Sequence, residues 1–222
     1  MTVKLAVFDC DGTMVDGQGS ICAAMESAFA AGGLPAPDRH LIRRIVGLSL
    51  PQAMRRLAPD AEAATHDLLV DAYKDAFRAA RAAGELSQPL FAGIADLIAG
   101  LAADGWTLGV ATGMSQRGLD HVLAAHGLTH HFATLQTADF HPSKPHPAMI
   151  EAALAETGAD RAATVMIGDT AYDMLMARDA GVRGLGVDWG YHTPAELREA
   201  GAASIAASPA ELAAQIRESV RR

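Results

Sequence analysis

Cysteine is scarce in this chain: its 222 residues contain two, Cys10 and Cys22, and their spacing matches no paired metal-ligand motif. This content disfavours a disulfide scaffold, and we expect a reducing compartment, the cytoplasm. Long apolar runs are also missing, since none reaches the roughly 18 to 20 residues that cross a bilayer. The sequence therefore predicts no membrane partner.

Positive charge is in short supply as well. The chain has 18 Lys and Arg residues against 26 Asp and Glu, for a net charge of −8. Nucleic-acid binding proteins displace phosphate counterions with basic patches, and this composition offers none, so a nucleic-acid partner is not expected. An anionic substrate would need a local lysine or a metal ion to offset the negative balance.

Hydrophobic residues make up 50% of the chain, which is enough for a substantial core. Short apolar runs alternate with helical patterns along most of the sequence, and such an alternation predicts a doubly wound α/β fold with a parallel sheet. Four of these runs are clear and one, 132–137, is weaker: Val3–Phe8, Trp106–Ala111, Phe132–Thr137, Thr164–Ile167 and Gly184–Val187.

Residues 17–88 break this alternation, because they read as helices with no strand among them. We expect an all-helical cap domain at 17–88, inserted after the first strand, and an α/β core formed by 1–16 and 89–222. Gly17–Gly19 and Ser87–Pro89 are the candidate hinges. A final short strand and helix are expected within 202–222.

The first apolar run ends in Asp9-Cys10-Asp11-Gly12-Thr13. Two carboxylates two residues apart at a strand end suit phosphoryl transfer, since one can attack phosphorus while the other carries a proton. A carboxylate is already ionised at neutral pH and needs no activating base. Gly12 allows a tight turn that brings backbone N–H groups toward a phosphate.

Three further polar segments follow later strands or precede a helix: Thr112-Gly113, Lys144 in Ser143-Lys144-Pro145-His146-Pro147, and Gly168-Asp169-Thr170-Ala171-Tyr172-Asp173. Ligands of doubly wound sheets bind at the carboxyl ends of the strands, where these segments fall. Together with the Asp9 segment they resemble, in order, the four motifs of the haloacid dehalogenase superfamily of phosphatases, in its phosphoglycolate-phosphatase-like form. The resemblance implies a Rossmann-like core.

The resemblance also implies roles for individual residues. Asp9 would be the nucleophile and Asp11 the acid and base, while Lys144 would be a fixed positive charge on the phosphoryl group. Gly12, Thr112 and Gly113 would bind phosphate oxygens together with Lys144. Mg²⁺ would be held by Asp9, Asp169 and the backbone carbonyl of Asp11.

Two other sets of residues have weaker assignments. Asp173 would bind a metal water or Lys144, or else would simply favour the helix N-terminus by its charge. In the cap, Gly47 begins the stretch Gly47-Leu48-Ser49, which resembles the specificity segment of the family. Arg43 precedes this stretch and could reach a carboxylate or phosphate of the substrate, although it also fits a solvated helix face.

The expected activity is Mg²⁺-dependent hydrolysis of a small phosphorylated metabolite, of the phosphoglycolate or sugar-phosphate type, through an aspartyl-phosphate. A phosphosugar mutase of the same superfamily is the enzyme alternative, although such mutases commonly have valine where Thr13 stands. A non-catalytic metabolite- or Mg²⁺-binding module is the alternative of another class. Monomer and homodimer both remain open.

Overall fold

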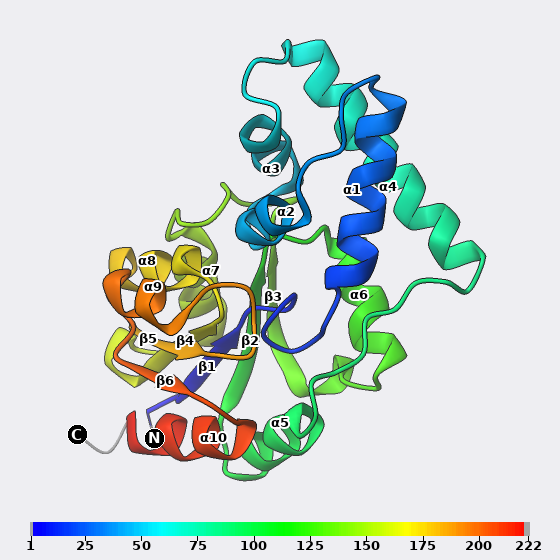
Figure 1. Cartoon of the computed structure of the whole chain (residues 1–222). Coiled ribbons are helices and arrows are strands. Elements are labelled where there is room, and N and C mark those ends of the chain that lie inside the picture. Colours follow the sequence, from blue (N-terminus) through cyan, green and yellow to red (C-terminus); the bar gives the residue numbers. More distant parts are fainter. Residues whose placement is uncertain (1, 220–222) are drawn as a thin grey trace.

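The computed structural model describes residues 2–219, and its centre is a sheet of six parallel strands in the order β3-β2-β1-β4-β5-β6 (Figure 1). Parallel strands that are covered on both faces are nearly continuous apolar runs in the sequence, which is why five of them could be predicted. The strands are β1 (Leu5–Phe8), β2 (Thr107–Thr112), β3 (Phe132–Thr137), β4 (Thr164–Gly168), β5 (Arg183–Val187) and β6 (Ser204–Ala206).

Helices cover both faces of this sheet. One hydrophobic cluster joins the sheet to α5 (Ile94–Ala103), α6 (Gln116–Ala125) and α10 (Pro209–Ser219). A second cluster joins the other face to α7 (Ala148–Thr157) and α8 (Ala171–Asp179). The predicted doubly wound α/β fold is therefore confirmed. Because β1 lies between β2 and β4, the strand order diverges from β1 in both directions, and a ligand is expected beside its carboxyl end.

The four helices that follow β1 and precede α5 in the sequence share a separate hydrophobic cluster and are here called the helical unit. They are α1 (Gln18–Ala31), α2 (Arg39–Ile45), α3 (Leu50–Leu57) and α4 (Ala63–Ala82). Figure 1 shows the unit at one end of the sheet, with α10 at the other. The chain enters and leaves the unit at one place, where Asp16 N–H donates to Pro89 O at 2.8 Å and Val15 pairs with Leu90. Of the candidate hinge residues, Gly17 precedes α1, and Gln18 and Gly19 form its first turn.

The sequence patterns did not predict α9 (Pro194–Glu199). This short helix begins with a capping box, in which the side chains of Thr193 and Glu196 each accept from the backbone N–H of the other. The 3-10 turns η1 (Thr129–His131) and η2 (Arg161–Ala163) lead into β3 and β4. Of the expected final strand and helix, residues 220–222 lie outside the described part. No helix within residues 2–219 is both long and apolar enough to span a bilayer.

Candidate active site

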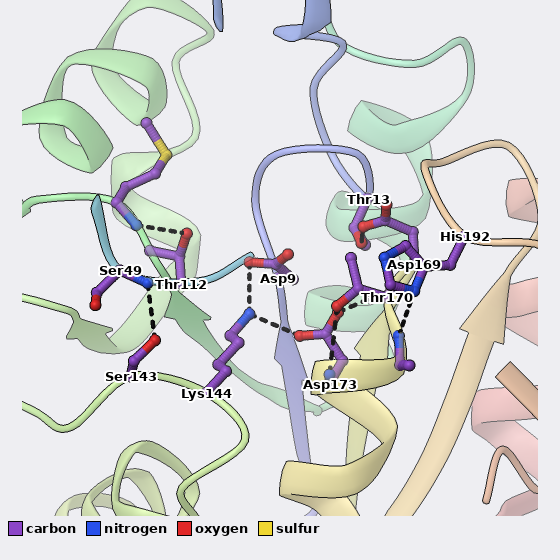
Figure 2. Close-up of polar contacts among 12 residues, drawn as sticks. Asp9, Thr13, Ser49, Thr112, Ser143, Lys144, Asp169, Thr170, Asp173 and His192 are labelled. Atoms are coloured by element: carbon purple, nitrogen blue, oxygen red, sulfur yellow. Dashed lines mark hydrogen bonds and ion pairs between the residues drawn. The ribbon is translucent and has the colours of Figure 1, made fainter. Parts of the chain in front are cut away.

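The strand ends bring together four of the predicted polar residues (Figure 2). Asp9 follows β1 and is fixed by its backbone N–H, which donates to Ile167 O of β4 at 2.9 Å. Asp169 follows β4, and Lys144 enters from the loop between β3 and α7. Asp173 lies in the first turn of α8. All four side chains are buried, with at most 1% of each exposed.

Gly12 makes the turn after β1 possible. Its φ is +88°, a conformation that disfavours every side chain. A Cβ at this position would also come within 2.3 Å of Asp169 Oδ2 and 2.5 Å of the Tyr191 ring. The turn therefore depends on glycine both for its backbone conformation and for the space around it.

Lys144 lies between two carboxylates. Its Nζ donates to Asp173 Oδ1 at 2.7 Å and forms an ion pair with Asp9 Oδ1 at 2.8 Å, without the angles of a hydrogen bond. Burial by itself would lower the pKa of Lys144, but the charges of Asp173 and Asp9 outweigh burial and the pKa is raised. The lysine is therefore a permanent cation at the end of β1.

Asp173 holds this lysine and also caps α8. Its Oδ2 accepts from Thr170 N at 3.1 Å and from Thr170 Oγ1 at 2.7 Å, and the Thr170 side chain in turn accepts from the Asp173 N–H. The two roles weighed from the sequence, a partner of Lys144 and a helix-terminus charge, are thus combined in one side chain.

Asp9 and Asp11 have carboxylate oxygens that accept no hydrogen bond. Neither carboxylate oxygen of Asp9 has a hydrogen-bond donor, nor does Oδ1 of Asp11, although all three are inaccessible to solvent. Burial raises the pKa of Asp9 to about 6 despite the opposing effect of Lys144. Burial, reinforced by the charge of Asp9, raises the pKa of Asp11 to about 7, and the nearby Gln88 amide opposes this rise. Gln88 Nε2 and Asp11 Oδ1 do not form a hydrogen bond with each other.

The carboxylates at this edge fit a divalent cation. Asp9, Asp169 and Asp173 each offer an oxygen, and these oxygens lie within 4.8 Å of one another. Asp173 accepts hydrogen bonds from Lys144 and Thr170, whereas Asp9 has the Lys144 ion pair but accepts no hydrogen bond. Burial raises the pKa of Asp169, and repulsion from the neighbouring carboxylates raises it further. A bound cation relieves that repulsion. Carboxylate oxygens are hard ligands of the kind that such ions prefer.

Asp169 is oriented by its neighbours. Its Oδ1 accepts from Thr13 Oγ1 at 2.8 Å and its Oδ2 from Tyr191 N at 2.9 Å. Trp189 Nε1 donates to the backbone carbonyl of Thr13 at 3.1 Å, which ties the loop after β5 to the turn after β1. The sequence pattern did not assign Trp189 or Tyr191 to the site. Their position directly after β5, at the carboxyl edge of the sheet, is the signal that could have identified them.

Thr112 and Gly113, at the end of β2, meet the helical unit. Thr112 is buried, and its Oγ1 accepts from Met114 N at 3.3 Å. A Cβ on Gly113 would lie 2.5 Å from Leu48 O and 2.6 Å from Gly47 O, so the two backbones pass in close contact. Gly47 itself has a φ of +96°.

A cavity of about 530 Å³ extends from Asp9 and Asp11 between the core and the helical unit. Gly47, Thr112 and Gly113 line it, whereas Arg43 does not. The structure thus groups Asp9, Lys144, Asp169 and Asp173 directly, and it places Gly12, Thr112 and Gly113 around them. It leaves Arg43 outside the cavity wall.

Arg44 makes several of the contacts between the helical unit and the core. Its guanidinium Nη1 donates to Glu196 Oε2 at 2.6 Å, and its backbone carbonyl accepts from Tyr172 Oη at 3.2 Å. His192 Nε2 also lies 3.2 Å from that carbonyl. Nearby, Ser49 N–H donates to Ser143 Oγ at 2.8 Å, next to Lys144.

Comparison with known proteins agrees with this architecture. A family model described as haloacid dehalogenase-like hydrolase matches residues 6–187. The protein named "Probable phosphatase IndB" of Dickeya dadantii (strain 3937) is 38% identical over 199 residues, with 88% of this chain and 86% of that protein covered. A phosphoglycolate phosphatase of Mesorhizobium japonicum is 29% identical over 204 residues, which cover 90% of this chain and 88% of the relative.

A solved structure is similar along nearly its whole length. The haloacid dehalogenase-like family hydrolase SP0104 of Streptococcus pneumoniae superposes with a TM-score of 0.83 at 27% identity, covering 96% of this chain and 98% of that one. The matched residues include Asp9, Asp11, Gly12, Thr112, Gly113, Lys144, Asp169 and Asp173 of the site, whereas Trp189, Tyr191 and His192 follow the matched range. This chain is a hydrolase and belongs to the haloacid dehalogenase-like family.

Proposed function

We propose that this protein is a Mg²⁺-dependent phosphatase, which hydrolyses a small phosphate monoester through an aspartyl-phosphate. One observation supports this most strongly: Asp9, at the end of the central strand, has two carboxylate oxygens without hydrogen-bond donors and lies 2.8 Å from the buried Lys144 ammonium. The names of the two relatives, a probable phosphatase and a phosphoglycolate phosphatase, support the same chemistry.

Asp9 is the nucleophile. One of its oxygens forms a bond to phosphorus as the bond from phosphorus to the leaving oxygen breaks, so the phosphoryl group passes to the enzyme. Water then attacks phosphorus, the bond to Asp9 breaks, and inorganic phosphate is released. Lys144 keeps Asp9 oriented and contributes positive charge that stabilises the transferring phosphoryl oxygens.

Asp11 moves the protons. It lies two residues after the nucleophile, in the turn opened by Gly12, and both Asp9 and Asp11 line the cavity. It gives a proton to the leaving alkoxide and later accepts one from the attacking water. Thr112, Gly113 and backbone N–H groups of the Gly12 turn bind phosphoryl oxygens.

Asp9, Asp169 and the backbone carbonyl of Asp11 are the proposed holders of Mg²⁺. When bound, the ion supplies positive charge that neutralises the phosphoryl group. Thr13 and Tyr191 keep Asp169 in place through the hydrogen bonds described above.

Residues 17–88 act as a cap, and residues 1–16 and 89–222 form the catalytic core. The cavity lies between the two, so the cap covers the substrate and excludes bulk water during transfer. A covered cavity of this kind suits a small phosphorylated metabolite of the phosphoglycolate or sugar-phosphate type.

The test is release of inorganic phosphate from p-nitrophenyl phosphate and a panel of metabolite phosphates, with Mg²⁺ and with EDTA. We expect Mg²⁺-dependent release that Asp9→Asn abolishes. Asp188→Asn is the matched control, because this exposed aspartate also follows a strand, β5, at the same edge of the sheet. Folded protein without phosphate release from any ester, or full activity in Asp9→Asn, would contradict the proposal.

A further inference from the structure

The cavity is larger than the smallest expected substrate needs. Its volume of about 530 Å³ lies within the range of roughly 300–1,000 Å³ that holds drug-sized ligands. A two-carbon leaving group such as glycolate would occupy only the part beside Asp9 and Asp11. Residues of α1 to α4 and of the start of α6 line the cavity, so the side chains of these helices decide what fits in the remaining volume.

Part of this remaining wall is apolar. Ile21 and Met25 of α1 line it together with Tyr73 and Phe77 of α4. The rings of Tyr73 and Phe77 have their centroids 5.1 Å apart and are tilted by 33° to each other. Such a surface favours a planar or apolar portion of a ligand, because aromatic faces bury much area at little cost in side-chain freedom.

The wall also carries unpaired positive charge. Arg81, near the end of α4, and Arg117, in the first turn of α6, both line the cavity. Within residues 2–219, no carboxylate lies at ion-pair distance from either guanidinium. Nε of Arg81 is inaccessible to solvent and has no hydrogen-bond partner. A buried donor left without a partner is costly and indicates a missing acceptor.

The surroundings of Arg81 agree with this. Burial lowers its pKa, and the charge of Arg117 lowers it further, so the two cations are near enough to repel each other. Arg78, one turn earlier on α4, also lines the cavity but is exposed and paired with Asp75. Asp139 is the carboxylate in this part of the wall, and it accepts from Gln116 N at 2.8 Å.

We propose that the substrate is a phosphate monoester with a second anionic group, a carboxylate or a phosphate, which binds between Arg81 and Arg117. Its phosphoryl group lies at Asp9, and an apolar or planar portion of its leaving group packs on Tyr73 and Phe77. This inference rests on the proposed phosphatase function. It assigns the recognition of the second anion to a cap helix and a core helix together, so that anion contacts both parts of the molecule at once.

The test uses aryl phosphates that differ in one charge. The 3- and 4-carboxyphenyl phosphates are compared with the matching carbamoylphenyl phosphates, which are neutral at the second position and closely similar in shape. A bisphosphate arm, 1,4-phenylene bisphosphate, distinguishes phosphate from carboxylate as the second anion. We expect kcat/KM for at least one anionic ester to exceed that of its neutral counterpart by about tenfold or more, because a hydrogen bond to a charged group stabilises binding by at least this factor.

Substitution then locates the preference. Arg81→Gln and Arg117→Gln should each reduce the ratio of kcat/KM between the anionic and neutral esters by about tenfold, and Arg81→Lys should retain part of it. Arg78→Gln, on the same wall but already paired, should leave the ratio unchanged.

The outcomes separate the two proposals. Hydrolysis of the neutral esters without preference for any anionic one refutes the second-anion site and leaves the phosphatase proposal standing. A preference that survives both Arg81→Gln and Arg117→Gln also refutes it. Absence of hydrolysis with every ester contradicts the phosphatase proposal and the inference that rests on it.

Discussion

Replacing Lys144 by methionine is the sharpest test of how the site is held together. The change removes a fully buried cation but keeps much of the side-chain volume. At the 2.8 Å between Nζ and Asp9 Oδ1, the Coulomb attraction is about 6 kcal/mol at an effective dielectric constant of about 20, and Asp173 adds a similar amount. Lost hydration of the three charges offsets most of this attraction. Removing one member of such a buried group typically costs about 3–5 kcal/mol of stability.

The assay is urea unfolding at pH 7 in EDTA, so that no cation substitutes for the lysine. Lys144→Met should lower the free energy of unfolding by about 3–5 kcal/mol, whereas Lys74→Met, at an exposed position on α4, should change it by less than about 0.5 kcal/mol. The double variant Lys144→Met with Asp173→Asn should be more stable than the sum of the single changes predicts, because one uncompensated charge is gone. A Lys144→Met protein within 1 kcal/mol of the wild type, or strict additivity, would refute this view of the cluster.

Three further results are expected. Asp11→Asn should slow hydrolysis of an alkyl phosphate by about 10²–10⁴-fold but that of p-nitrophenyl phosphate much less, because nitrophenolate leaves without a proton; equal losses in kcat with both esters would argue against general-acid catalysis. Gly12→Ala should lower the free energy of unfolding by more than the backbone strain of about 1–2 kcal/mol, because the new Cβ would lie 2.3 Å from a buried carboxylate oxygen. Gly33→Ala, also at positive φ but in open space, should lower it by that strain alone. The Arg44–Glu196 pair holds the pKa of Glu196 at about 2, below the ordinary 4.5, so its stabilisation of about 0.2–1 kcal/mol is present above pH 4.5 and lost as pH falls toward 2. The stability difference between wild type and Glu196→Gln should therefore shrink below pH 4.5, and a difference that grows in acid would contradict this sign.

Much of the fold could be predicted because its signals are local. Strands buried on both faces are short apolar runs, and the predicted strand 132–137 has the same bounds as β3 in the structure. The helix α9 was missed because it has six residues, too few for a clear apolar period, and its main signal is the capping box at Thr193 and Glu196.

The predictable part of the site is the part that follows strand ends. Asp9, Thr112 and Asp169 could be placed together because parallel strands align their carboxyl ends, and the motif around Lys144 completed the set. Arg81 and Arg117 could not be found in this way. Each lies on an amphipathic helix where an arginine ordinarily faces solvent, and only the folded structure shows that both line one cavity.

The chain enters and leaves the helical unit at adjacent positions, and this has a consequence for the order of folding. β1 must pair with β2 and β4, so that Leu5 meets Thr107 and Thr164, and these are contacts of long sequence separation. Pairing Val15 with Leu90 closes a loop of about 75 residues, at an entropic cost of about 4 kcal/mol if the loop is unstructured.

Prior folding of the helical unit shortens that loop. Ser20, at the start of α1, and Ser87, after α4, are joined by two hydrogen bonds of 3.1 Å, so a folded unit presents its two ends side by side. About ten flexible residues then remain, and the closure cost falls to about 2 kcal/mol. The insertion that separates β1 from its partner strands in sequence thus becomes, once its local helical contacts form, the element that brings them within reach.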